Sequence, residues 1–346
     1  MHYSQIFYFR TMNILRKLLF PFAILYGLIT SIRNFLFDKG ILKSYSFDIP
    51  IIAVGNLSVG GTGKTPQIEY LIRLLSPIYK VAVLSRGYKR KSEGFILADE
   101  TATAEMLGDE PLQMFQKFPN VQFAVDTDRR NGISTLLSQK EKPEVILLDD
   151  AFQHRKVKAG FYIMLTSYGD LFCDDYMLPT GNLRESRNGA KRADVIIVTK
   201  CPKTISEAEQ ITIKKKIGLD ITILFSTIEY DEKVYGIDSE FSVEEIKLKD
   251  KLLLAGIANP TSFFNYLQKV NDRLVVFPDH HHFTENDCKE IIQKANGSMI
   301  VTTEKDFVRL KNQSIPSLYY LPIKGKIIAN EELDNRILNF VKNFSV

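Results

Sequence analysis

The chain contains few of the residues that crosslink secreted proteins or bind structural metals. Its three cysteines, Cys173, Cys201 and Cys288, are far apart and odd in number. They therefore predict neither a disulfide framework nor a zinc site, and they favour a reducing cytoplasm. A large excess of one charge is also missing, because 45 basic residues and 41 acidic residues leave a net charge of +4. This balance does not indicate nucleic acid as a partner, and 346 residues of ordinary globular composition predict about two domains.

A conventional membrane-spanning run is missing as well. Leu18 to Ile32 is nearly apolar, but fifteen residues at about 1.5 Å each fall short of the roughly 20 that cross a bilayer, and Pro21 interrupts them. Basic residues flank this run: Arg10, Arg16, Lys17 and Arg33. We therefore expect residues 1–40 to hold a membrane-associated helix that lies in the interface. A signal peptide, which would need a small-residue cleavage site, and a helix buried in the protein's own core are the alternatives.

An apolar strand followed by a glycine-rich segment is the most informative pattern in the chain. The segment Ser58-Val59-Gly60-Gly61-Thr62-Gly63-Lys64-Thr65 comes just after the apolar run Ile49 to Val54. The glycines let backbone N–H groups turn toward phosphate oxygens, Lys64 adds a positive charge, and Thr65 offers a hydroxyl to Mg²⁺. Ser58 replaces the first glycine of the usual motif. The strand before the loop and the helical segment after it nevertheless favour a nucleotide triphosphate site over an ordinary turn.

Short β-branched runs recur along the chain, separated by helix-sized segments. They are Val81 to Leu84, Val121 to Val125, Val145 to Leu148, Phe161 to Leu165 and Val195 to Thr199, with a second set at Leu252 to Gly256, Leu274 to Phe277 and Met299 to Thr303. Runs that are apolar throughout predict parallel strands covered on both faces. The expected fold is α/β, with a P-loop kinase-like, mostly parallel sheet and helices on both faces over residues 41–230. Residues 231–346 are expected to form a linker and a smaller C-terminal α/β lobe, and Ile221 to Tyr230 an extended connection outside the core.

Two adjacent carboxylates, Asp149 and Asp150, end the apolar run that begins at Val145. At a strand end beside a phosphate loop such acids hold Mg²⁺ directly or through water, so Thr65, Asp149 and Asp150 are the predicted metal ligands. Three further clusters place charge or imidazole in predicted loops: Gly108-Asp109-Glu110-Pro111, Leu183-Arg184-Glu185-Ser186 and Phe277-Pro278-Asp279-His280-His281-His282-Phe283. The adjacent histidines lack the i, i+4 spacing of a helical zinc pair, and solvated loop histidines are the alternative interpretation.

These motifs, in this order, resemble the tetraacyldisaccharide 4′-kinases of bacterial lipid A biosynthesis. The resemblance covers most of the chain and rests on Val54 to Pro66, Ser85 to Tyr88, Gly108 to Pro111, Asp128-Arg129, Asp149 to His154, Leu178 to Glu185, Asp279-His280 and Thr303 to Asp306. It implies transfer of the ATP γ-phosphoryl group to the 4′-hydroxyl of an acylated glucosamine disaccharide 1-phosphate. It also implies two α/β lobes around a cleft, and an N-terminal helix bound peripherally or monotopically at the cytoplasmic face of the inner membrane. No obligate protein partner is evident from the sequence.

The resemblance also implies roles for particular residues. Residues Ser58 to Thr65 match the ATP site, with Lys64 on the phosphates and Thr65 on Mg²⁺, and Asp149 and Asp150 match the acidic pair. The proposed base falls on Asp109, assisted by His280 from the other lobe, with His281 or His282 as the alternatives if the register differs. Residues that map near the reacting groups, as substrate contacts, are Glu110, Arg129, Gln153, Arg184 and Glu185.

A membrane-associated P-loop ATPase, which couples hydrolysis to regulation or transport, is the main alternative function. It would share the phosphate loop and the acidic pair but would not need a histidine in the opposite lobe. A non-catalytic scaffold would not need Lys64 and Thr65 to be intact. A GTPase is less favoured, because Thr199-Lys200 is followed by Cys201-Pro202 and not by the aspartate of a guanine-reading motif. ATP and Mg²⁺ are therefore the expected cofactors.

Overall fold

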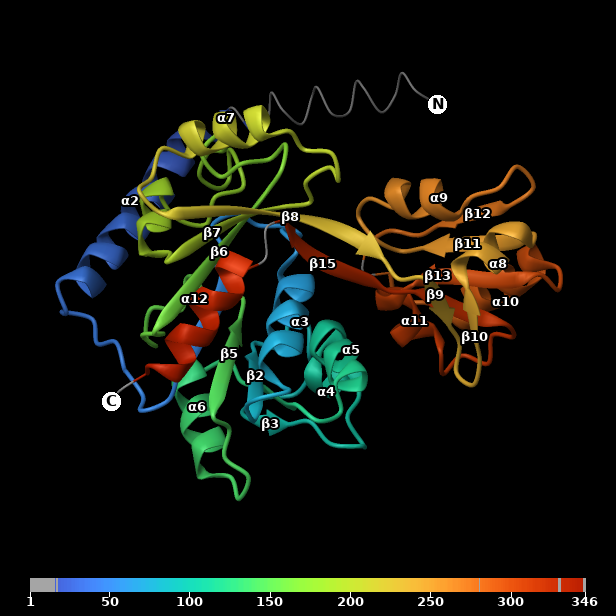
Figure 1. The fold of residues 1–346 in the computed structure, drawn as a ribbon, viewed down its shortest axis with the longest axis horizontal. Coiled ribbons are helices and arrows are strands. Elements are labelled where there is room, and N and C mark those ends of the chain that lie inside the picture. Colours follow the sequence, from blue (N-terminus) through green and yellow to red (C-terminus); the bar gives the residue numbers. More distant parts are fainter. Residues whose placement is uncertain (1–15, 17, 280, 329–330, 345–346) are drawn as a thin grey trace.

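The computed structural model describes residues 16, 18–279, 281–328 and 331–344, which form two lobes around two sheets (Figure 1). The larger sheet has nine strands in the order β15-β8-β7-β6-β1-β5-β2-β4-β3, and the smaller has six in the order β10-β9-β14-β13-β11-β12. In the larger sheet, strands β2, β5, β1, β6, β7 and β8 pair in parallel with their neighbours in that order. The predicted α/β fold, mostly parallel with a smaller lobe, is confirmed.

The elements of the larger lobe follow one another up to residue 230. They are α2 (Phe20–Asp38), β1 (Ile51–Asn56), α3 (Lys64–Leu75), β2 (Val81–Ser85), β3 (Ile96–Leu97), α4 (Ala104–Leu107), α5 (Asp109–Lys117), β4 (Gln122–Val125), α6 (Arg129–Ser138), β5 (Val145–Asp149), β6 (Phe161–Ser167), the 3₁₀ helix η1 (Arg187–Arg192), β7 (Val195–Thr199), α7 (Glu207–Ile217) and β8 (Thr222–Tyr230).

The smaller lobe comes next, and the last two elements return to the larger lobe. The smaller lobe holds β9 (Lys233–Tyr235), β10 (Glu240–Ser242), α8 (Val243–Leu248), β11 (Lys251–Ala255), α9 (Thr261–Leu267), β12 (Arg273–Val276), α10 (Glu285–Ala295), β13 (Met299–Thr303), α11 (Glu304–Leu310) and β14 (Leu318–Leu321). The returning elements are β15 (Ile323–Ile328) and α12 (Glu331–Lys342).

Strand β1 shows why these sequences form buried parallel strands. All six of its residues are buried, and successive side chains point to opposite faces of the sheet. Ile52 and Val54 pack in one core with α3 and α12, whereas Ile51 and Ala53 pack in a second core with α6. Because both faces are covered, an alternating polar pattern would bury polar side chains, and the continuous apolar run avoids that cost.

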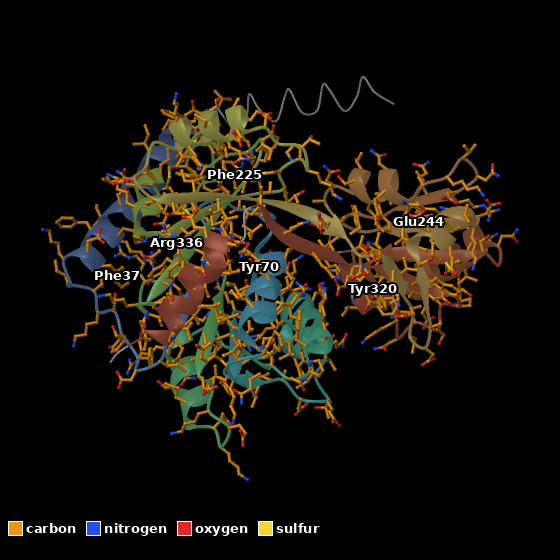
Figure 2. The ribbon with its side chains drawn as sticks, in the orientation of Figure 1. Phe37, Tyr70, Phe225, Glu244, Tyr320 and Arg336 are labelled. Atoms are coloured by element: carbon orange, nitrogen blue, oxygen red, sulfur yellow. The ribbon has the colours of Figure 1, made fainter. Side chains whose placement is uncertain are left out.

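Two parts of the chain lie elsewhere than the sequence suggested. The interpretation of Ile221 to Tyr230 as an extended connection outside the core is wrong, because β8 pairs with β7 and β15 and its centre is buried. In addition, β15 and α12 belong to the larger lobe although they lie within residues 231–346. Helix α12 packs on the large sheet, where Figure 2 labels Arg336 on α12 and Tyr70 on α3. The Tyr70 hydroxyl donates to Asp334 of α12 at 2.5 Å.

The chain passes between the lobes twice, and the two passages lie side by side. Strands β8 and β15 are antiparallel, in a register that runs from Phe225 opposite Ile328 to Tyr230 opposite Ile323. The N–H of Asp231 donates to the carbonyl of Pro322 at 3.0 Å, just beyond the last pair. Figure 1 shows both strands extending from the large sheet toward the smaller lobe.

Helix α2 is longer than the apolar run that predicts it. It has 19 residues and begins with Pro21 in its first turn, where a missing N–H is tolerated. By length and composition alone Phe20–Asp38 is sufficient to cross a membrane. The count of fifteen apolar residues therefore underestimates the length of the helix. Whether the helix spans a membrane or lies in its interface depends on what the helix contacts.

Candidate active site

The glycine-rich segment forms a loop between the buried end of β1 and the first turn of α3. Gly60 and Gly63 have φ angles of +113° and +82°, which favour glycine. The segment that includes Asn182 and Arg184 runs beside the loop, because the N–H of Val59 donates to Asn182 and the N–H of Arg184 donates to Leu57, each at 2.8 Å. A strand, a glycine-rich bend and a helix N-terminus are thus in the order that suits phosphate binding.

Asp149 ends β5 in a buried position close to this loop. Its Oδ2 accepts a hydrogen bond from the Ser85 hydroxyl at 3.0 Å, whereas its Oδ1 is buried with no hydrogen-bond partner in the described part of the chain. Burial, reinforced by the negative charges of Glu110 and Asp150, raises the pKa of Asp149 from 3.8 to about 6. A nearby cation would relieve both effects.

Asp150 follows with a φ of +48° and faces two cations. The Lys64 ammonium is 3.5 Å from Oδ1, and the Arg184 guanidinium is 3.2 Å from Oδ2. Burial opposes ionisation of Asp150, but the positive charges of Lys64 and Arg184 outweigh it and lower the pKa of this carboxyl. Asp150 is therefore ionised at neutral pH and joins the phosphate loop to the Leu183-Arg184-Glu185 segment.

Asp109 and Glu110 form the first turn of α5, where the lobes meet. The Thr65 hydroxyl donates to Glu110 at 3.2 Å, so α5 contacts the helix that follows the phosphate loop. Asp109 accepts a hydrogen bond from Nε of Arg309 in α11 at 3.0 Å. Lys305 of the same helix is 4.0 Å from Glu110. The structure thus brings Asp109, Glu110 and Thr65 together and adds Arg309, which no sequence motif singled out.

The predicted histidine partner of Asp109, His280, lies outside the described residues, so this pairing stays a prediction. Of the two alternatives, His281 is held within its own segment. Its Nε2 is 3.0 Å from Oδ2 of Asp287, and its ring stacks on Phe277 with 4.7 Å between ring centroids. These contacts hold the His281 side chain against residues of the smaller lobe.

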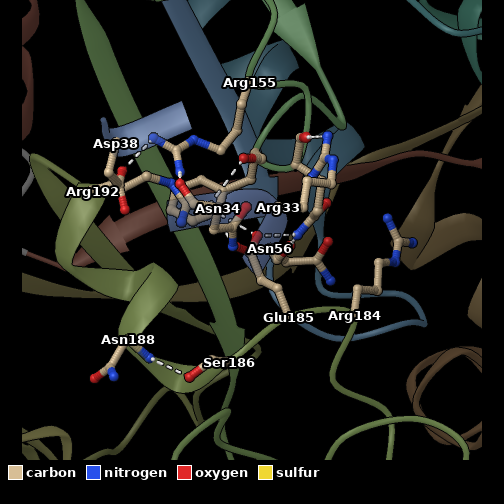
Figure 3. A network of polar contacts seen from close by, with 12 residues as sticks. Arg33, Asn34, Asp38, Asn56, Arg155, Arg184, Glu185, Ser186, Asn188 and Arg192 are labelled. Atoms are coloured by element: carbon tan, nitrogen blue, oxygen red, sulfur yellow. Dashed lines mark hydrogen bonds and ion pairs between the residues drawn. The ribbon is translucent and has the colours of Figure 1, made fainter. Parts of the chain in front are cut away.

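Glu185 and Gln153 lie in a hydrogen-bonded network beneath α2 (Figure 3). The buried Glu185 carboxylate accepts from the Asn34 amide at 2.7 Å, the Gln153 amide at 3.1 Å and the Arg192 guanidinium at 2.8 Å. Gln153 also donates to the carbonyl of Asn56 at the end of β1, at 2.7 Å. The network therefore links α2 to the strand that precedes the phosphate loop.

Helix α2 also bonds to the main chain of two predicted substrate residues. The Tyr26 hydroxyl donates to the carbonyl of Arg184 at 3.0 Å, and Arg33 donates to the carbonyl of Gln153 at 3.1 Å. These bonds fix the backbone from which the side chains of Arg184 and Gln153 project. No pattern in the sequence predicts this arrangement, because polar residues within an apolar helix do not reveal what they contact.

Arg129 occupies a different position from the other predicted substrate residues. Its side chain is fully buried and donates to the carbonyl oxygens of Asp126 and, at 3.1 Å, Asp149. Burial lowers the pKa of Arg129 to about 10, although the neighbouring carboxylates favour its charged form. The guanidinium thus supports the acidic strand end from inside the protein, and a direct substrate contact would require its exposure.

A second set of ion pairs, which the sequence did not predict, joins the two lobes through Lys117 of α5. The Lys117 ammonium is 2.8 Å from Glu69 of α3 and 3.0 Å from Glu304 of α11. Both carboxylates are buried. Burial raises the pKa of Glu304, and Lys117 counteracts this effect. Lys117 thereby connects the helix after the phosphate loop, the helix that begins at Asp109, and the smaller lobe.

The chain is similar to known proteins in sequence and in fold. Residues 15–342 match the family described as tetraacyldisaccharide-1-P 4′-kinase. The chain is 66% identical over 335 residues to the tetraacyldisaccharide 4′-kinase of Flavobacterium johnsoniae, which covers 96% of this chain and 98% of that protein. It is 44% identical over 356 residues to the enzyme of the same name from Bacteroides thetaiotaomicron, with 95% and 94% covered. The fold is similar to the crystal structure of LpxK from Aquifex aeolicus in complex with ATP, with a TM-score of 0.79, 32% identity, and 94% and 99% of the two chains covered.

Proposed function

The chain belongs to the tetraacyldisaccharide-1-P 4′-kinase family, and from this premise we propose how its residues transfer the ATP γ-phosphoryl group to the 4′-hydroxyl of a tetraacyldisaccharide 1-phosphate. One observation carries the proposal. Lys64 and Thr65, which end the phosphate loop, lie next to Asp150 at 3.5 Å and Glu110 at 3.2 Å respectively. Nucleotide-binding groups and the carboxylates of α5 are therefore neighbours, as direct transfer between two bound substrates requires.

The residues at the acidic strand end fit Mg²⁺. A hydroxyl from Thr65 and carboxylates from Asp149 and Asp150 are the oxygen ligands this ion prefers, and the buried, unpartnered Oδ1 of Asp149 offers an available acceptor. The described residues contain no cluster of three or more His, Cys, Asp or Glu suited to a metal. That finding agrees with an ion held by one or two carboxylates and the substrate phosphates. When bound, Mg²⁺ neutralises charge on the β- and γ-phosphate oxygens.

Asp109 is the proposed proton acceptor for the sugar hydroxyl. A sugar alcohol is a poor nucleophile at neutral pH, and a positioned base contributes about 10²- to 10⁴-fold to the rate. Asp109 contacts Arg309 across the lobe interface, so accepting a proton requires that the acceptor hydroxyl replace or join this contact. His280 is proposed to orient Asp109 and share the proton.

Cations around the phosphate loop are proposed to stabilise the transferring group. Lys64 and Arg184 both face Asp150 and are only partly exposed, at 14% and 29% of their side chains. Positive groups fixed in a partly desolvated site act more strongly on developing charge than they would in water. Because α2 bonds to the carbonyl of Arg184, the position of this helix affects where the Arg184 guanidinium lies.

The exposed face of α2 supports membrane association, which we propose occurs at the cytoplasmic face of the inner membrane. Its exposed large apolar side chains are Phe20, Phe22, Ile24, Leu25, Leu28, Ile29, Ile32 and Phe35. The opposite side contacts the larger lobe through Tyr26, Asn34 and Asp38. A helix fixed along one side to a folded lobe and apolar on the other suits insertion into one leaflet, and we propose peripheral or monotopic binding.

A transfer assay tests the function. ATP labelled in its γ-phosphate is incubated with Mg²⁺ and a detergent-dispersed tetraacyldisaccharide 1-phosphate, and labelled lipid is measured. We expect Asp109→Ala to reduce the yield of labelled lipid by at least about tenfold with little change in ATP affinity, because the residue acts on the acceptor. Asp238→Ala, which removes an exposed carboxylate between β9 and β10, is the matched control.

The same assay separates the kinase from the alternative ATPase. Release of labelled inorganic phosphate at the same rate with and without the lipid, with no labelled lipid formed, would contradict the proposal and support acceptor-independent hydrolysis. Equal activity of the wild type and Asp109→Ala would instead contradict the assignment of the base alone.

A further inference from the structure

Two consecutive side chains at the carboxyl end of β7 contact the phosphate loop. The Thr199 hydroxyl donates to the carbonyl of Thr62 at 2.8 Å, and the Lys200 ammonium donates to the carbonyl of Gly61. Thr199 is buried, and its hydroxyl also lies 3.3 Å from the carbonyl of Thr166 in the neighbouring strand β6. Neither side chain belongs to the loop or to the acidic pair, yet both end on the loop's backbone.

The direction of these bonds determines where the loop's donors point. In a trans peptide unit, the carbonyl of one residue and the N–H of the next point in opposite directions. Bonds that hold the carbonyls of Gly61 and Thr62 toward β7 therefore turn the N–H groups of Thr62 and Gly63 away from β7. Inward-turned N–H groups of this kind bind phosphate oxygens in a glycine-rich loop. The two side chains thus orient phosphate donors without occupying the phosphate position.

The loop needs such anchoring because its glycines can adopt a wide range of backbone φ and ψ angles. Gly60, Gly61 and Gly63 lack the side chain that would restrict φ, so an unanchored loop would have to lose conformational freedom when the nucleotide binds. Bonds already present in the folded protein shift this entropy loss from binding to folding. Preorganisation of this kind increases affinity without adding a contact to the ligand.

The local backbone at the end of β7 is shaped for this contact. Lys200 has a φ of +59°, a left-handed conformation that is uncommon for residues other than glycine. The N–H of Cys201 donates to the carbonyl of Ser226 at 2.9 Å, which ties the turn to β8. A Cβ on Gly63 would lie 3.6 Å from Cβ of Thr199, in ordinary van der Waals contact, so loop and strand end already pack together.

We propose that Thr199 and Lys200 are positioning residues that preorganise the phosphate loop for the polyphosphate of ATP. The inference rests on the proposed function only in taking an adenine nucleotide as the ligand. Loss of either donor weakens ATP and ADP binding, because the orientation of the loop's N–H groups is no longer fixed. Turnover at saturating ATP is expected to change little, because both side chains bond to the main chain of the loop and act through it.

Equilibrium nucleotide binding, measured by calorimetry without any lipid, tests the proposal. Thr199→Val keeps the shape and removes the donor, and Lys200→Met keeps an apolar stem and removes the charge. We expect each to raise the Kd of ATP and ADP about tenfold, the effect of one charge-assisted or buried hydrogen bond. Binding of AMP, which lacks the β-phosphate, is expected to change by less than about threefold. Thr199→Ser and Lys200→Arg retain a donor and are expected to restore most of the affinity.

Two controls separate positioning from general damage. Lys203→Met removes an exposed lysine from the same connection and is expected to leave ATP binding unchanged. The melting temperature without nucleotide is expected to stay near that of the wild type for Lys200→Met, because Lys200 lies on the surface, and for Thr199→Ser, which keeps the hydroxyl. Thr199→Val is expected to melt a few degrees lower, because it leaves the carbonyl of Thr62 without this donor. A fall in kcat at saturating ATP that matches the rise in Kd would overturn the positioning role.

An unchanged Kd of ATP in both Thr199→Val and Lys200→Met would also overturn the proposal, as would equal weakening of ATP and AMP. The failure of the proposed function looks different. A wild-type protein that binds ATP but forms no labelled lipid contradicts the kinase assignment, while the binding measurements on these variants still decide the role of the strand end.

Discussion

The larger lobe is joined to α2 on one side and to the smaller lobe on the other, and the two joints differ in chemistry. At the α2 joint, Tyr26 and Arg33 bond to main-chain carbonyls and Asn34 bonds to the buried Glu185 carboxylate, with one ion pair, between Asp38 and Arg155, at the end of the helix. At the lobe joint, charged groups meet charged groups, as in Lys117 with Glu304 and Arg309 with Asp109. Short hydrogen bonds to fixed acceptors hold two elements in a single relative position. Ion pairs tolerate changes in the distance and angle between the charged groups, and salt weakens them.

This difference indicates which side of the active site is fixed and which side moves. Helix α2 sets the backbone of Gln153 and Arg184 by direct bonds. At the lobe interface Asp109, the proposed base, contacts Arg309, and in the proposed reaction the acceptor hydroxyl replaces or joins this contact. A catalytic site that closes around two substrates benefits from one rigid wall and one adjustable wall.

The largest expected effect is at the α2 joint. Glu185→Ala leaves the Arg192 guanidinium, Gln153 and Asn34 without their shared acceptor. Removing one partner of a buried, hydrogen-bonded charge typically costs about 3–5 kcal/mol. We expect the free energy of unfolding, measured in urea, to fall by about that amount. Glu207→Ala, an exposed glutamate on α7, is the control, and a loss below about 1 kcal/mol would show that the joint is not held by Glu185.

A smaller effect is expected at Asp149, which lies between the joints. Its pKa rises from 3.8 in the unfolded chain to about 6 in the folded protein, so the folded state binds the proton more tightly. The contribution of Asp149 to wild-type stability is therefore expected to fall as pH rises from about 4 to 6, by at most roughly 3 kcal/mol at about 1.4 kcal/mol per pKa unit.

Asp149→Asn keeps the acceptor for Ser85 but carries no charge. We expect the variant to lack this part of the pH dependence and to melt at a higher temperature than the wild type above pH 6. Thermal denaturation in metal-free buffer from pH 4 to pH 8 measures the difference. Identical pH profiles for the two proteins would show that Asp149 ionises without cost.

The smallest expected effect on stability is at the lobe joint. Lys117→Met leaves Glu69 with Arg73 but leaves Glu304 without its cation. We expect the free energy of unfolding to fall by about 1–2 kcal/mol, less than for Glu185→Ala, because Lys117 is partly exposed and the lobes can separate to admit water. We expect kcat to fall severalfold, since the placement of α5 depends on this contact.

Salt and a conservative change sharpen this test. Lys117→Arg keeps the charge and is expected to recover most of the activity. The difference between the wild type and Lys117→Met is expected to shrink at high ionic strength, whereas the effect of Glu185→Ala is expected to persist. The same salt response at both joints would contradict the division into a rigid and an adjustable side.

Local patterns in the sequence were sufficient for the phosphate loop and for most of the buried strands. The glycines, Lys64 and Thr65 are close together in the chain, so the phosphate loop they form can be recognised without knowledge of distant residues. Strand β8 escaped recognition because it carries Ser226, Thr227 and Glu229, and because half of its pairing comes from β15, about a hundred residues later. Pairing with a strand so far along the chain cannot be predicted from the local sequence of β8.

The candidate site shows the same division. Asp149 and Asp150 follow a recognisable strand, and the resemblance to the family selected Asp109 and Glu185. The burial of Arg129 and the partners of Glu185 depend on which elements pack together, and the bonds from Lys117 to Glu69 and Glu304 join residues 48 and 187 positions apart. Only the assembled fold determines such contacts.

The pairing of Tyr230 with Ile323 has a consequence for how the protein is made. The smaller lobe is an insertion into what would otherwise be a β-hairpin, so the ribosome must synthesise the whole insertion before β15 can reach β8. The edge strand and the covering helix α12 of the nine-stranded sheet therefore arrive last. Until then β8 has an unpaired edge, a site where a nascent chain is open to mispairing and to chaperone capture.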